Sequence, residues 1–358
     1  MSPSRPAHRA TLALAGVAFA TAILLVGFIP AAACAVGTWK PQRLETDGTL
    51  VEFGSVTFTD RSHGWIAGDS GGIVATSDGG AHWTAHDAEG GHYSGALAFP
   101  DHAHGWTVNG GSIFATSDGG ATWNPQTSGV DDDFNAITFI DSNRGWAVGS
   151  AWKQGGLGII VATTDGGATW LPQTTARGDY ELHSVAFTDA DHGWAVGGNL
   201  ITATTDGGAN WTSQASGIHT ALWSVTFTSV THGWAVGLNG TIIATTDGGA
   251  TWTTQTSGTE ASLYSVAFTD SNHGWAVGID TDSYGNPTAP VILATSDGGA
   301  TWKAQDVSDF GATARLYSVS FVDATHGWAA GEIPSVSGES TPVILATDKQ
   351  APPVSGGK

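Results

Sequence analysis

From Gly37 onwards, apolar residues occur in short runs that are bounded by Gly, Asp or Asn. One stretch shows the whole pattern, since SVTFT, GWAVG, IIATT and TWTTQ follow one another with polar turns between them. Runs of this length, rich in β-branched and aromatic residues, are typical of strands. No stretch after Gly37 has apolar residues at the three- and four-residue spacing of an amphipathic helix. The pattern predicts an all-β protein.

The four-run pattern repeats along the chain. Its Gly-Trp pair recurs at intervals of 41, 40, 48, 40, 41 and 53 residues, at Trp65, Trp106, Trp146, Trp194, Trp234, Trp275 and Trp328. This period is typical of propeller blades rather than of helical repeats. The chain is therefore predicted to form one seven-bladed β-propeller of four-stranded antiparallel blades, over residues 37–348.

The last copy of the repeat is incomplete. Six copies carry a full T-[ST]-D-G-G-x-x-W turn before their fourth strand, whereas the seventh stops at Asp348. The missing strand is found at the other end of the propeller, where Gly37 to Gln42 read GTWKPQ and match the GATWNPQ after a complete turn. We expect this N-terminal strand to complete the last blade and close the ring. Residues 349–358 are expected to be a flexible tail.

Residues 1–34 have the layout of an export signal. Arg5 and Arg9 precede an apolar run over residues 10–29, and Cys34 follows three alanines. Three outcomes are open: lipidation of Cys34 as in bacterial lipoproteins, retention of the run as a membrane anchor, or ordinary cleavage and secretion. Each places the propeller outside the cytoplasm. Because Cys34 is the only cysteine, no internal disulfide is possible.

The composition limits the partners. The chain has 32 acidic and 12 basic residues, a formal net charge of −20, which disfavours binding to DNA or RNA. No cofactor is expected, and a monomer is expected.

The repeated Asp and His residues are interpreted as turn residues. An Asp before two glycines accepts hydrogen bonds from the amides of its own turn, and glycine tolerates the positive φ that a tight turn needs. This structural role is assigned to Asp78, Asp118, Asp165, Asp206, Asp247 and Asp297. The histidines before the Gly-Trp pairs sit in successive blades, too far apart to share one metal ion. No metal site is predicted.

Departures from the repeat indicate where a ligand would bind. Strand parity puts the length variation and the inter-blade connections on one face, and variable loops on a rigid scaffold commonly carry function. Two tryptophans, Trp152 and Trp223, are left over after the repeat positions are assigned. The position of Trp223 holds an aromatic or imidazole ring in four adjacent blades. The candidate ligand-binding residues are Trp152, His183, Trp223, Tyr264 and Tyr317. Such rings either stack on a sugar or grip a peptide, or they only pack beneath the loops.

The turn motif is the Asp box, and the chain resembles the bacterial-neuraminidase-repeat propellers that share it. This resemblance implies a possible glycoside hydrolase of the sialidase or xyloglucanase type. Sialidases have an Arg-Ile-Pro motif and an arginine cluster, and the sequence contains no Arg-Ile-Pro. Hydrolysis also needs two carboxylates at a set separation, and the acids of the variable face, Asp179, Glu181, Asp280 and Glu332, show no recognisable pair. Hydrolysis is the alternative function.

The combined motif SVxFxDxxHGWAVG followed by the Asp box more closely resembles the photosystem II stability and assembly factors and their non-photosynthetic bacterial relatives. That resemblance spans Gly37 to Asp348 and implies a seven-bladed ring with an exported, often lipidated N-terminus. It implies a non-catalytic binding or assembly scaffold, here for a protein or polysaccharide at the cell envelope. Photosynthetic members bind membrane proteins through an arginine-rich patch, and this acidic chain lacks a comparable cluster.

Overall fold

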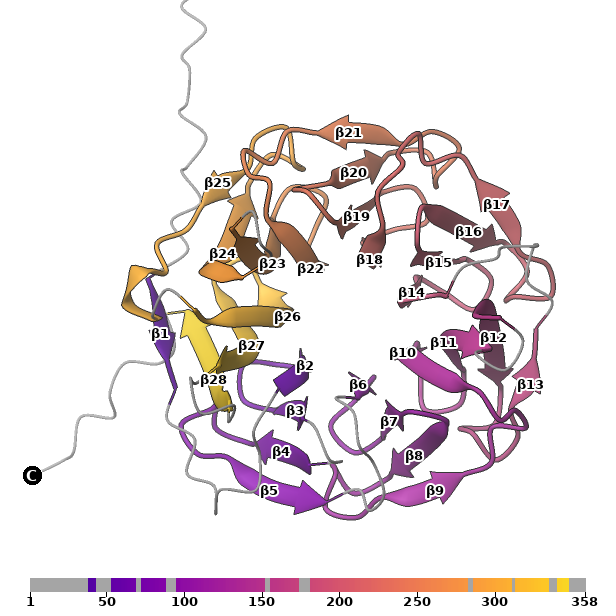
Figure 1. Ribbon diagram of the computed structural model, residues 1–358. Coiled ribbons are helices and arrows are strands. Elements are labelled where there is room, and N and C mark those ends of the chain that lie inside the picture. Colours follow the sequence, from indigo (N-terminus) through magenta and orange to yellow (C-terminus); the bar gives the residue numbers. More distant parts are fainter. Residues whose placement is uncertain are drawn as a thin grey trace, which may run out of the picture. The chain divides into compact units, whose positions relative to one another are not determined.

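The computed structural model describes residues 38–42, 53–68, 72–87, 95–151, 155–173, 181–282, 286–310, 313–334 and 340–347. The chain divides into residues 1–33 and 34–358. The described residues all lie in the second unit, so the predicted leader, Cys34 and the tail fall outside them. Within this unit, seven four-stranded sheets surround a central channel (Figure 1). The predicted all-β, seven-bladed propeller is confirmed.

Each blade runs from an innermost strand beside the channel to an outermost strand at the rim (Figure 1). Blade 1 consists of β2 (Phe53–Phe58), β3 (Gly64–Gly68), β4 (Gly72–Thr76) and β5 (Thr84–Asp87), and blade 2 of β6 (Ala96–Ala98), β7 (Gly105–Asn109), β8 (Ser112–Thr116) and β9 (Asn124–Gln126). Blade 3 consists of β10 (Asp133–Phe139), β11 (Gly145–Ala151), β12 (Leu157–Thr163) and β13 (Leu171–Pro172), and blade 4 of β14 (Ser184–Phe187), β15 (Gly193–Gly197), β16 (Leu200–Thr204) and β17 (Thr212–Gln214). Blade 5 consists of β18 (Leu222–Phe227), β19 (Gly233–Gly237), β20 (Ile242–Thr245) and β21 (Thr253–Gln255), and blade 6 of β22 (Ser262–Phe268), β23 (Gly274–Thr281), β24 (Pro287–Thr295) and β25 (Lys303–Ala304). Blade 7 consists of β26 (Arg315–Asp323), β27 (His326–Pro334), β28 (Ser340–Thr347) and β1 (Trp39–Pro41).

Helical structure is minimal in the part of the chain that the structure covers, where the 3-10 turn η3 (Ser308–Phe310) precedes the last blade. Within the same ranges, no helix has the length and apolar character needed to cross a membrane.

Aromatic stacks hold neighbouring blades together. Trp328 of blade 7 lies flat on Phe58 of blade 1, with ring centroids 3.5 Å apart and planes inclined by 6°. The same stack occurs at the other six junctions, between Trp65 and Phe99, Trp106 and Phe139, Trp146 and Phe187, Trp194 and Phe227, Trp234 and Phe268, and Trp275 and Phe321. The Phe ring lies over the Gly of the Gly-Trp pair, and a Cβ on Gly64 would overlap Phe58. The repeated Gly therefore makes room for the stack that joins the blades.

The Gly-Trp tryptophans also donate across the junctions. The Trp65 indole N–H donates to the carbonyl oxygen of Gly119 in the next blade's Asp box, over 2.7 Å. Equivalent bonds are donated by Trp106, Trp146, Trp194, Trp234 and Trp328. Trp275 faces blade 7, whose Asp box is truncated, and its indole nitrogen has no partner among the described residues. Among the described residues, the junction between blades 6 and 7 is thus the one that lacks this bond.

The N-terminal strand closes the ring as predicted. β1 pairs antiparallel with β28, with Trp39 opposite Thr347 and Pro41 opposite Leu345. Trp39 packs edge-on against Phe321, at 5.8 Å and 84°. The Asp-box tryptophans of the other six blades pack in the same way on the Phe of their own blade. β1 therefore supplies the strand pairing and the aromatic packing of a fourth strand.

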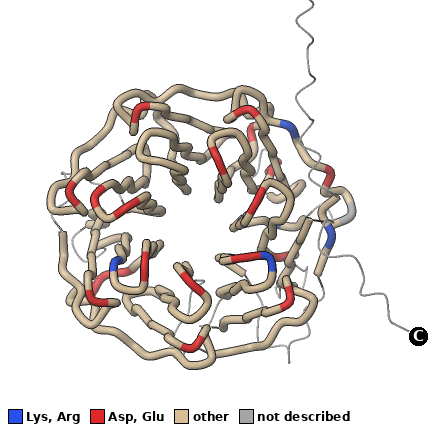
Figure 2. The backbone as a smooth tube through the Cα atoms, turned by 180° about the vertical axis from the view of Figure 1, so that it is seen from behind, with Lys and Arg blue, Asp and Glu red and all other residues tan. Residues whose placement is uncertain are grey.

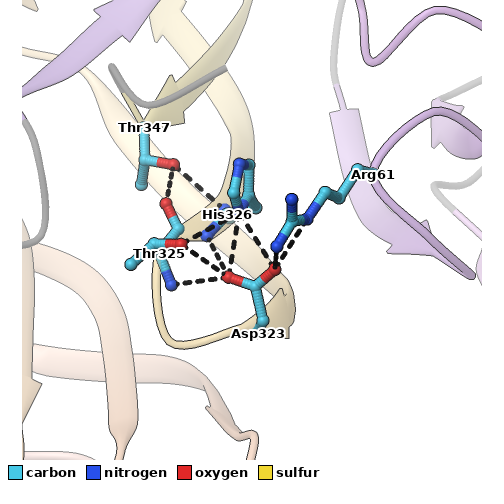
Figure 3. A network of polar contacts seen from close by, with 6 residues as sticks. Arg61, Asp323, Thr325, His326 and Thr347 are labelled. Atoms are coloured by element: carbon cyan, nitrogen blue, oxygen red, sulfur yellow. Dashed lines mark hydrogen bonds and ion pairs between the residues drawn. The ribbon is translucent and has the colours of Figure 1, made fainter. Parts of the chain in front are cut away.

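The junction between blades 7 and 1 has an additional ion pair. Arg61 of blade 1 reaches Asp323 of blade 7, with its Nε and Nη2 both 2.9 Å from Oδ2 (Figure 3). Asp323 also accepts hydrogen bonds from its own turn, including the His326 amide at 3.0 Å. Because the Arg61 side chain is 65% exposed, the pair contributes at most about 1 kcal/mol to closure.

Candidate functional site at the aromatic mouth of the channel

Three of the candidate residues, Trp223, Tyr264 and Tyr317, stand at a bulge in the innermost strands. In β2, β10, β18, β22 and β26 the pairing with the second strand shifts by one residue at an equivalent place. A bulge leaves one residue unpaired and redirects its side chain. The residues in these shifts are Gly54, Asn135, Trp223, Tyr264 and Tyr317. In blades 2 and 4 the equivalent residues, Gly95 and His183, directly precede β6 and β14.

The last Gly of the GWAVG run gives the bulge its space. A Cβ on Gly237 would overlap the carbonyl oxygen of Ala221, and one on Gly278 would overlap that of Ser262. The second strand must therefore lack a side chain where the bulged backbone approaches. One repeated glycine of the scaffold thus helps to position the variable side chain beside it.

Four ring side chains follow one another around the mouth. The ring centroids of His183 and Trp223 are 4.3 Å apart, those of Trp223 and Tyr264 are 6.0 Å apart, and those of Tyr264 and Tyr317 are 5.7 Å apart. All four side chains are partly exposed. We call this group the aromatic crescent. The structure thus brings together four of the five residues predicted from the sequence, and the fifth, Trp152, lies outside the described residues.

A buried carboxylate fixes one end of the crescent. Glu332 has a side chain only 3% exposed, and its Oε1 accepts hydrogen bonds from the Tyr317 hydroxyl at 2.8 Å and from Arg315 Nη1 at 3.0 Å. Burial and the Glu332 carboxylate raise the pKa of Tyr317. The phenol therefore stays protonated and donates to Glu332, which holds its ring in place.

The other end of the crescent lies beside the Glu181 carboxylate. His183 lies 4.0 Å from the Glu181 carboxylate, and burial lowers the pKa of His183 although Glu181 opposes that shift. The Asn135 side-chain amide donates to Glu181 Oε1 at 2.7 Å and to the Leu182 carbonyl at 2.9 Å. His183 is thus neutral near pH 7, and its ring acts as an aromatic surface.

Acidic side chains surround this face. Exposed acids lie before or at the start of innermost strands and at or just after the end of β23, at Asp131, Asp133, Glu181, Glu260, Asp280 and Asp282. Glu260, Asp280 and Asp282 line a groove of about 640 Å³ together with Asn239 and Thr281. The described basic residue on this face, Arg315, is bound to Glu332. The mouth is therefore suited to a positively charged ligand.

The described arginines do not gather as a sialidase would require. Arg61 pairs with Asp323, Arg144 with Asp141 and Arg315 with Glu332, at distances of 2.9 to 3.0 Å. Arg61 and Arg144 lie in turns on the opposite face from the crescent. Among the described residues, no arginine cluster faces the mouth to hold a substrate carboxylate.

Sequence reasoning found the crescent but missed its support. From the sequence, Glu332 was only one of the acids of the variable face, and Arg315 had no predicted role. The two residues lie opposite each other in the register of β26 and β27. The predicted pairing of these strands could have indicated the ion pair, because it puts a basic and an acidic residue opposite each other beside Tyr317.

The Asp-box carboxylates accept hydrogen bonds from their own turns. Asp78 Oδ1 accepts from the Thr76 hydroxyl and the His82 amide, each at 2.9 Å, while Gly79 and Gly80 have φ values of 75° and 93°. The same bonds to the turn recur at the other five Asp-box residues, Asp118, Asp165, Asp206, Asp247 and Asp297.

The sequence profile of one protein family matches the chain. The family is described as photosynthesis system II assembly factor YCF48, and it matches residues 31–96, 209–263 and 253–337, which together are more than half of the chain. The chain belongs to the YCF48 family. No curated protein matches the chain by sequence.

Solved structures agree on the fold. The chain is similar to YCF48 from Cyanidioschyzon merolae (20% identity, TM-score 0.66, covering 87% of this chain and 98% of that one). It is similar to YCF48 bound to D1 peptide (19% identity, TM-score 0.66, 86% and 96% covered). A streptogramin B lyase is equally similar in shape (12% identity, TM-score 0.67, 86% and 97% covered). At these identities the likeness shows the propeller fold alone, so function has to be argued from the site.

Proposed function

We propose that this chain is a non-catalytic scaffold that binds an extended segment of a protein partner at the aromatic crescent. The observation that carries the proposal is the unbroken run of His183, Trp223, Tyr264 and Tyr317 over four adjacent blades. Partly exposed rings held by a rigid sheet offer large contact area at low cost in side-chain entropy. Membership of the YCF48 family supports an assembly role, and a YCF48 structure contains a bound D1 peptide.

The partner segment is expected to be basic. The mouth carries Glu181, Glu260, Asp280 and Asp282 as exposed acids, and the chain has a net charge of −20. Acidic surfaces attract basic partners and raise the association rate, more so at low salt. Lysine or arginine side chains of the partner would also lie favourably over the faces of Trp223 and Tyr264.

We further propose that the propeller works outside the cytoplasm, held to the membrane by its N-terminus or secreted. The support is the sequence of residues 1–34, with its basic start, apolar run and Cys34. A partner at the cell envelope follows from that location. Incorporation of a labelled fatty acid that is lost with Cys34→Ser would support lipid attachment, and absence of label on the wild type would contradict it.

A random-peptide display library tests the binding proposal. The wild type should enrich peptides rich in Lys, Arg and apolar residues, and their affinity should fall as salt is added. Trp223→Ala combined with Tyr264→Ala should lower the affinity for the enriched peptides by about tenfold or more. Leu171→Ala, which changes a 68% exposed residue on outer strand β13, is the matched control and should bind normally.

Several results would contradict this function. Failure of the folded wild type to enrich any peptide would reject a peptide site, and enrichment of acidic peptides would reject the charge argument. Equal binding by the double variant would move the site away from the crescent. Turnover of an aryl glycoside by the purified wild type would favour the hydrolase alternative.

A further inference from the structure

The turns on the face opposite the crescent share one design. In six of the seven turns between the first and second strands, an Asp accepts hydrogen bonds from the following amides, as Asp60 does from Ser62 at 2.6 Å and from His63 at 2.8 Å; blade 5 has Ser229 at this position. In five of these six turns a His ends the turn and bonds the same carboxylate, and in blade 3 Arg144 does so. Figure 2, drawn from behind the view of Figure 1, shows acidic positions recurring around the channel. These Asp and His residues are explained by the turns themselves.

One turn position varies and points to the preceding blade. The residue after the Asp is Arg61 in blade 1 and His102 in blade 2, whereas blades 3 to 7 have Ser142, Ala190, Val230, Ser271 and Ala324. Arg61 bonds Asp323 of blade 7, and His102 Nε2 lies 2.8 Å from Asp60 Oδ2 of blade 1. His102 therefore adds an imidazole to an Asp–His pair that exists in other blades without it.

Three ligand atoms meet at this junction. Asp60 Oδ2 is 3.0 Å from His63 Nδ1 and 2.8 Å from His102 Nε2. The three ligand atoms all lie within 4.8 Å of one another, and the two imidazole rings stack at 4.2 Å with planes inclined by 23°. Asp60 Oδ1 accepts from the two turn amides and also lies 3.2 Å from His63 Nδ1, and Oδ2 is the oxygen that both imidazole nitrogens approach to within 3.0 Å.

We propose that Asp60, His63 and His102 bind a divalent transition-metal ion of the zinc type, which links blade 1 to blade 2. Zinc binds imidazole nitrogen and carboxylate oxygen at about 2.0 to 2.2 Å, which puts neighbouring ligand atoms roughly 3.3 Å apart around a tetrahedral ion. Distances of 2.8 and 3.0 Å need only small side-chain adjustments to reach this geometry. Two imidazoles favour zinc, nickel or copper over calcium or magnesium.

The junction that the ion would bridge lacks a bond that the four junctions between blades 2 and 6 have. In blades 3 to 6, the Asp-box tryptophan donates its indole N–H to a Gln side chain of the preceding blade, as Trp170 does to Gln126 at 3.1 Å. Between blades 1 and 2 the Gln is replaced by His86, and the Trp123 indole nitrogen has no partner among the described residues. At the two junctions of blade 7, the indole nitrogens of Trp83 and Trp39 likewise have no partner among the described residues. A metal link would reinforce this junction.

The test is a calorimetric titration of the full chain with Zn²⁺ in chelator-free buffer, together with thermal unfolding in Zn²⁺ and in EDTA. The wild type should bind Zn²⁺ at this site and unfold at a higher temperature in Zn²⁺ than in EDTA. His102→Ala changes a side chain that is 54% exposed, so the variant should fold. Compared with the wild type, the variant should bind one equivalent of Zn²⁺ fewer or bind Zn²⁺ about tenfold more weakly. Its unfolding temperature should no longer differ between Zn²⁺ and EDTA.

Two further variants distinguish a specific zinc site from nonspecific binding of Zn²⁺ to other histidines or to Cys34. His192→Ala removes the same kind of Asp–His pair in blade 4, where blade 5 offers only Val230, and it should bind Zn²⁺ like the wild type. Val230→His should add a second site by placing an imidazole beside Asp189 and His192. Zinc binding that is absent from the wild type, or unchanged by His102→Ala, would overturn the proposal. Equal losses with His192→Ala would overturn it too.

Discussion

At the scale of single residues, the clearest consequence of the repeat lies at Trp275. Its ring is packed like those of its six equivalents, fully buried and stacked on Phe321 at 3.5 Å. Yet its indole nitrogen has no hydrogen-bond partner among the described residues, because the seventh Asp box is truncated. A buried donor without a partner costs about 1 to 3 kcal/mol. Trp275 therefore packs as tightly as the others but contributes less to stability.

This difference predicts the effect of removing the indole N–H. Trp234 is the matched residue, stacked on Phe268 at 3.6 Å, but its N–H donates to the Gly298 carbonyl at 3.0 Å. Both Trp→Phe changes lose ring volume, and only Trp234→Phe also loses a hydrogen bond. Trp234→Phe should lower the free energy of unfolding by about 1 to 3 kcal/mol more than Trp275→Phe. Urea unfolding of both variants measures this, and equal losses would contradict it.

At the scale of elements, the Asp-box turn is a charged unit within a β-hairpin. The Thr122 hydroxyl and amide donate to the Asp118 carboxylate at 2.7 and 2.9 Å, and Thr116 adds a bond at 2.8 Å. These bonds lower the pKa of Asp118 to about 2, and the equivalent bonds from Thr251 and Thr245 lower that of Asp247 to about 2. The ionised form of each carboxylate is therefore more stable in the folded than in the unfolded chain.

The lowered pKa of these carboxylates makes the stability of the protein depend on pH. The folded pKa lies below the unfolded value of about 3.9, so the stabilisation is complete above about pH 4 and is lost as the pH falls towards about 2. Thr122→Val removes the hydroxyl donor and should be less stable than the wild type at pH 7. The gap between the two urea midpoints should shrink between about pH 4 and pH 2. A gap that stays constant over this range would contradict the assignment.

The elements also show how far the sequence could predict the structure. Strands and turns were predictable because each copy repeats the same apolar runs, and β1 was predictable because GTWKPQ supplies what the seventh copy lacks. The crescent was predictable because Trp223, Tyr264 and Tyr317 share one position in the repeat. The pair of Glu332 with Arg315 depends on the register of two strands. The contact of His102 with Asp60 depends on how two blades pack, which no local pattern encodes.

At the scale of the whole molecule, one short strand decides whether the ring is closed. β1 has three residues, yet it supplies the partner of β28 and the aromatic contact of Trp39 with Phe321, and the residue after it, Gln42, bonds Gly79 at 3.1 Å. Gly79 belongs to blade 1 and also accepts from Trp328. The N-terminal segment thus joins the first and last blades with the Gln-to-Gly bond that four other junctions form within a continuous repeat, whereas the Trp83 indole nitrogen has no partner among the described residues.

Deletion of residues 38–42 tests this closure. Without β1, blade 7 has three strands, β28 becomes an unpaired edge, and a buried Trp is lost, which alone costs about 3 to 5 kcal/mol. We expect a lower thermal midpoint, with faster amide exchange in β26, β27 and β28 than in the middle blades. We also expect association at micromolar concentration, because a free edge strand pairs with another chain. Deletion of residues 354–358 is the matched control, and a melting curve shared by both deletions would show that closure by β1 does not stabilise the ring.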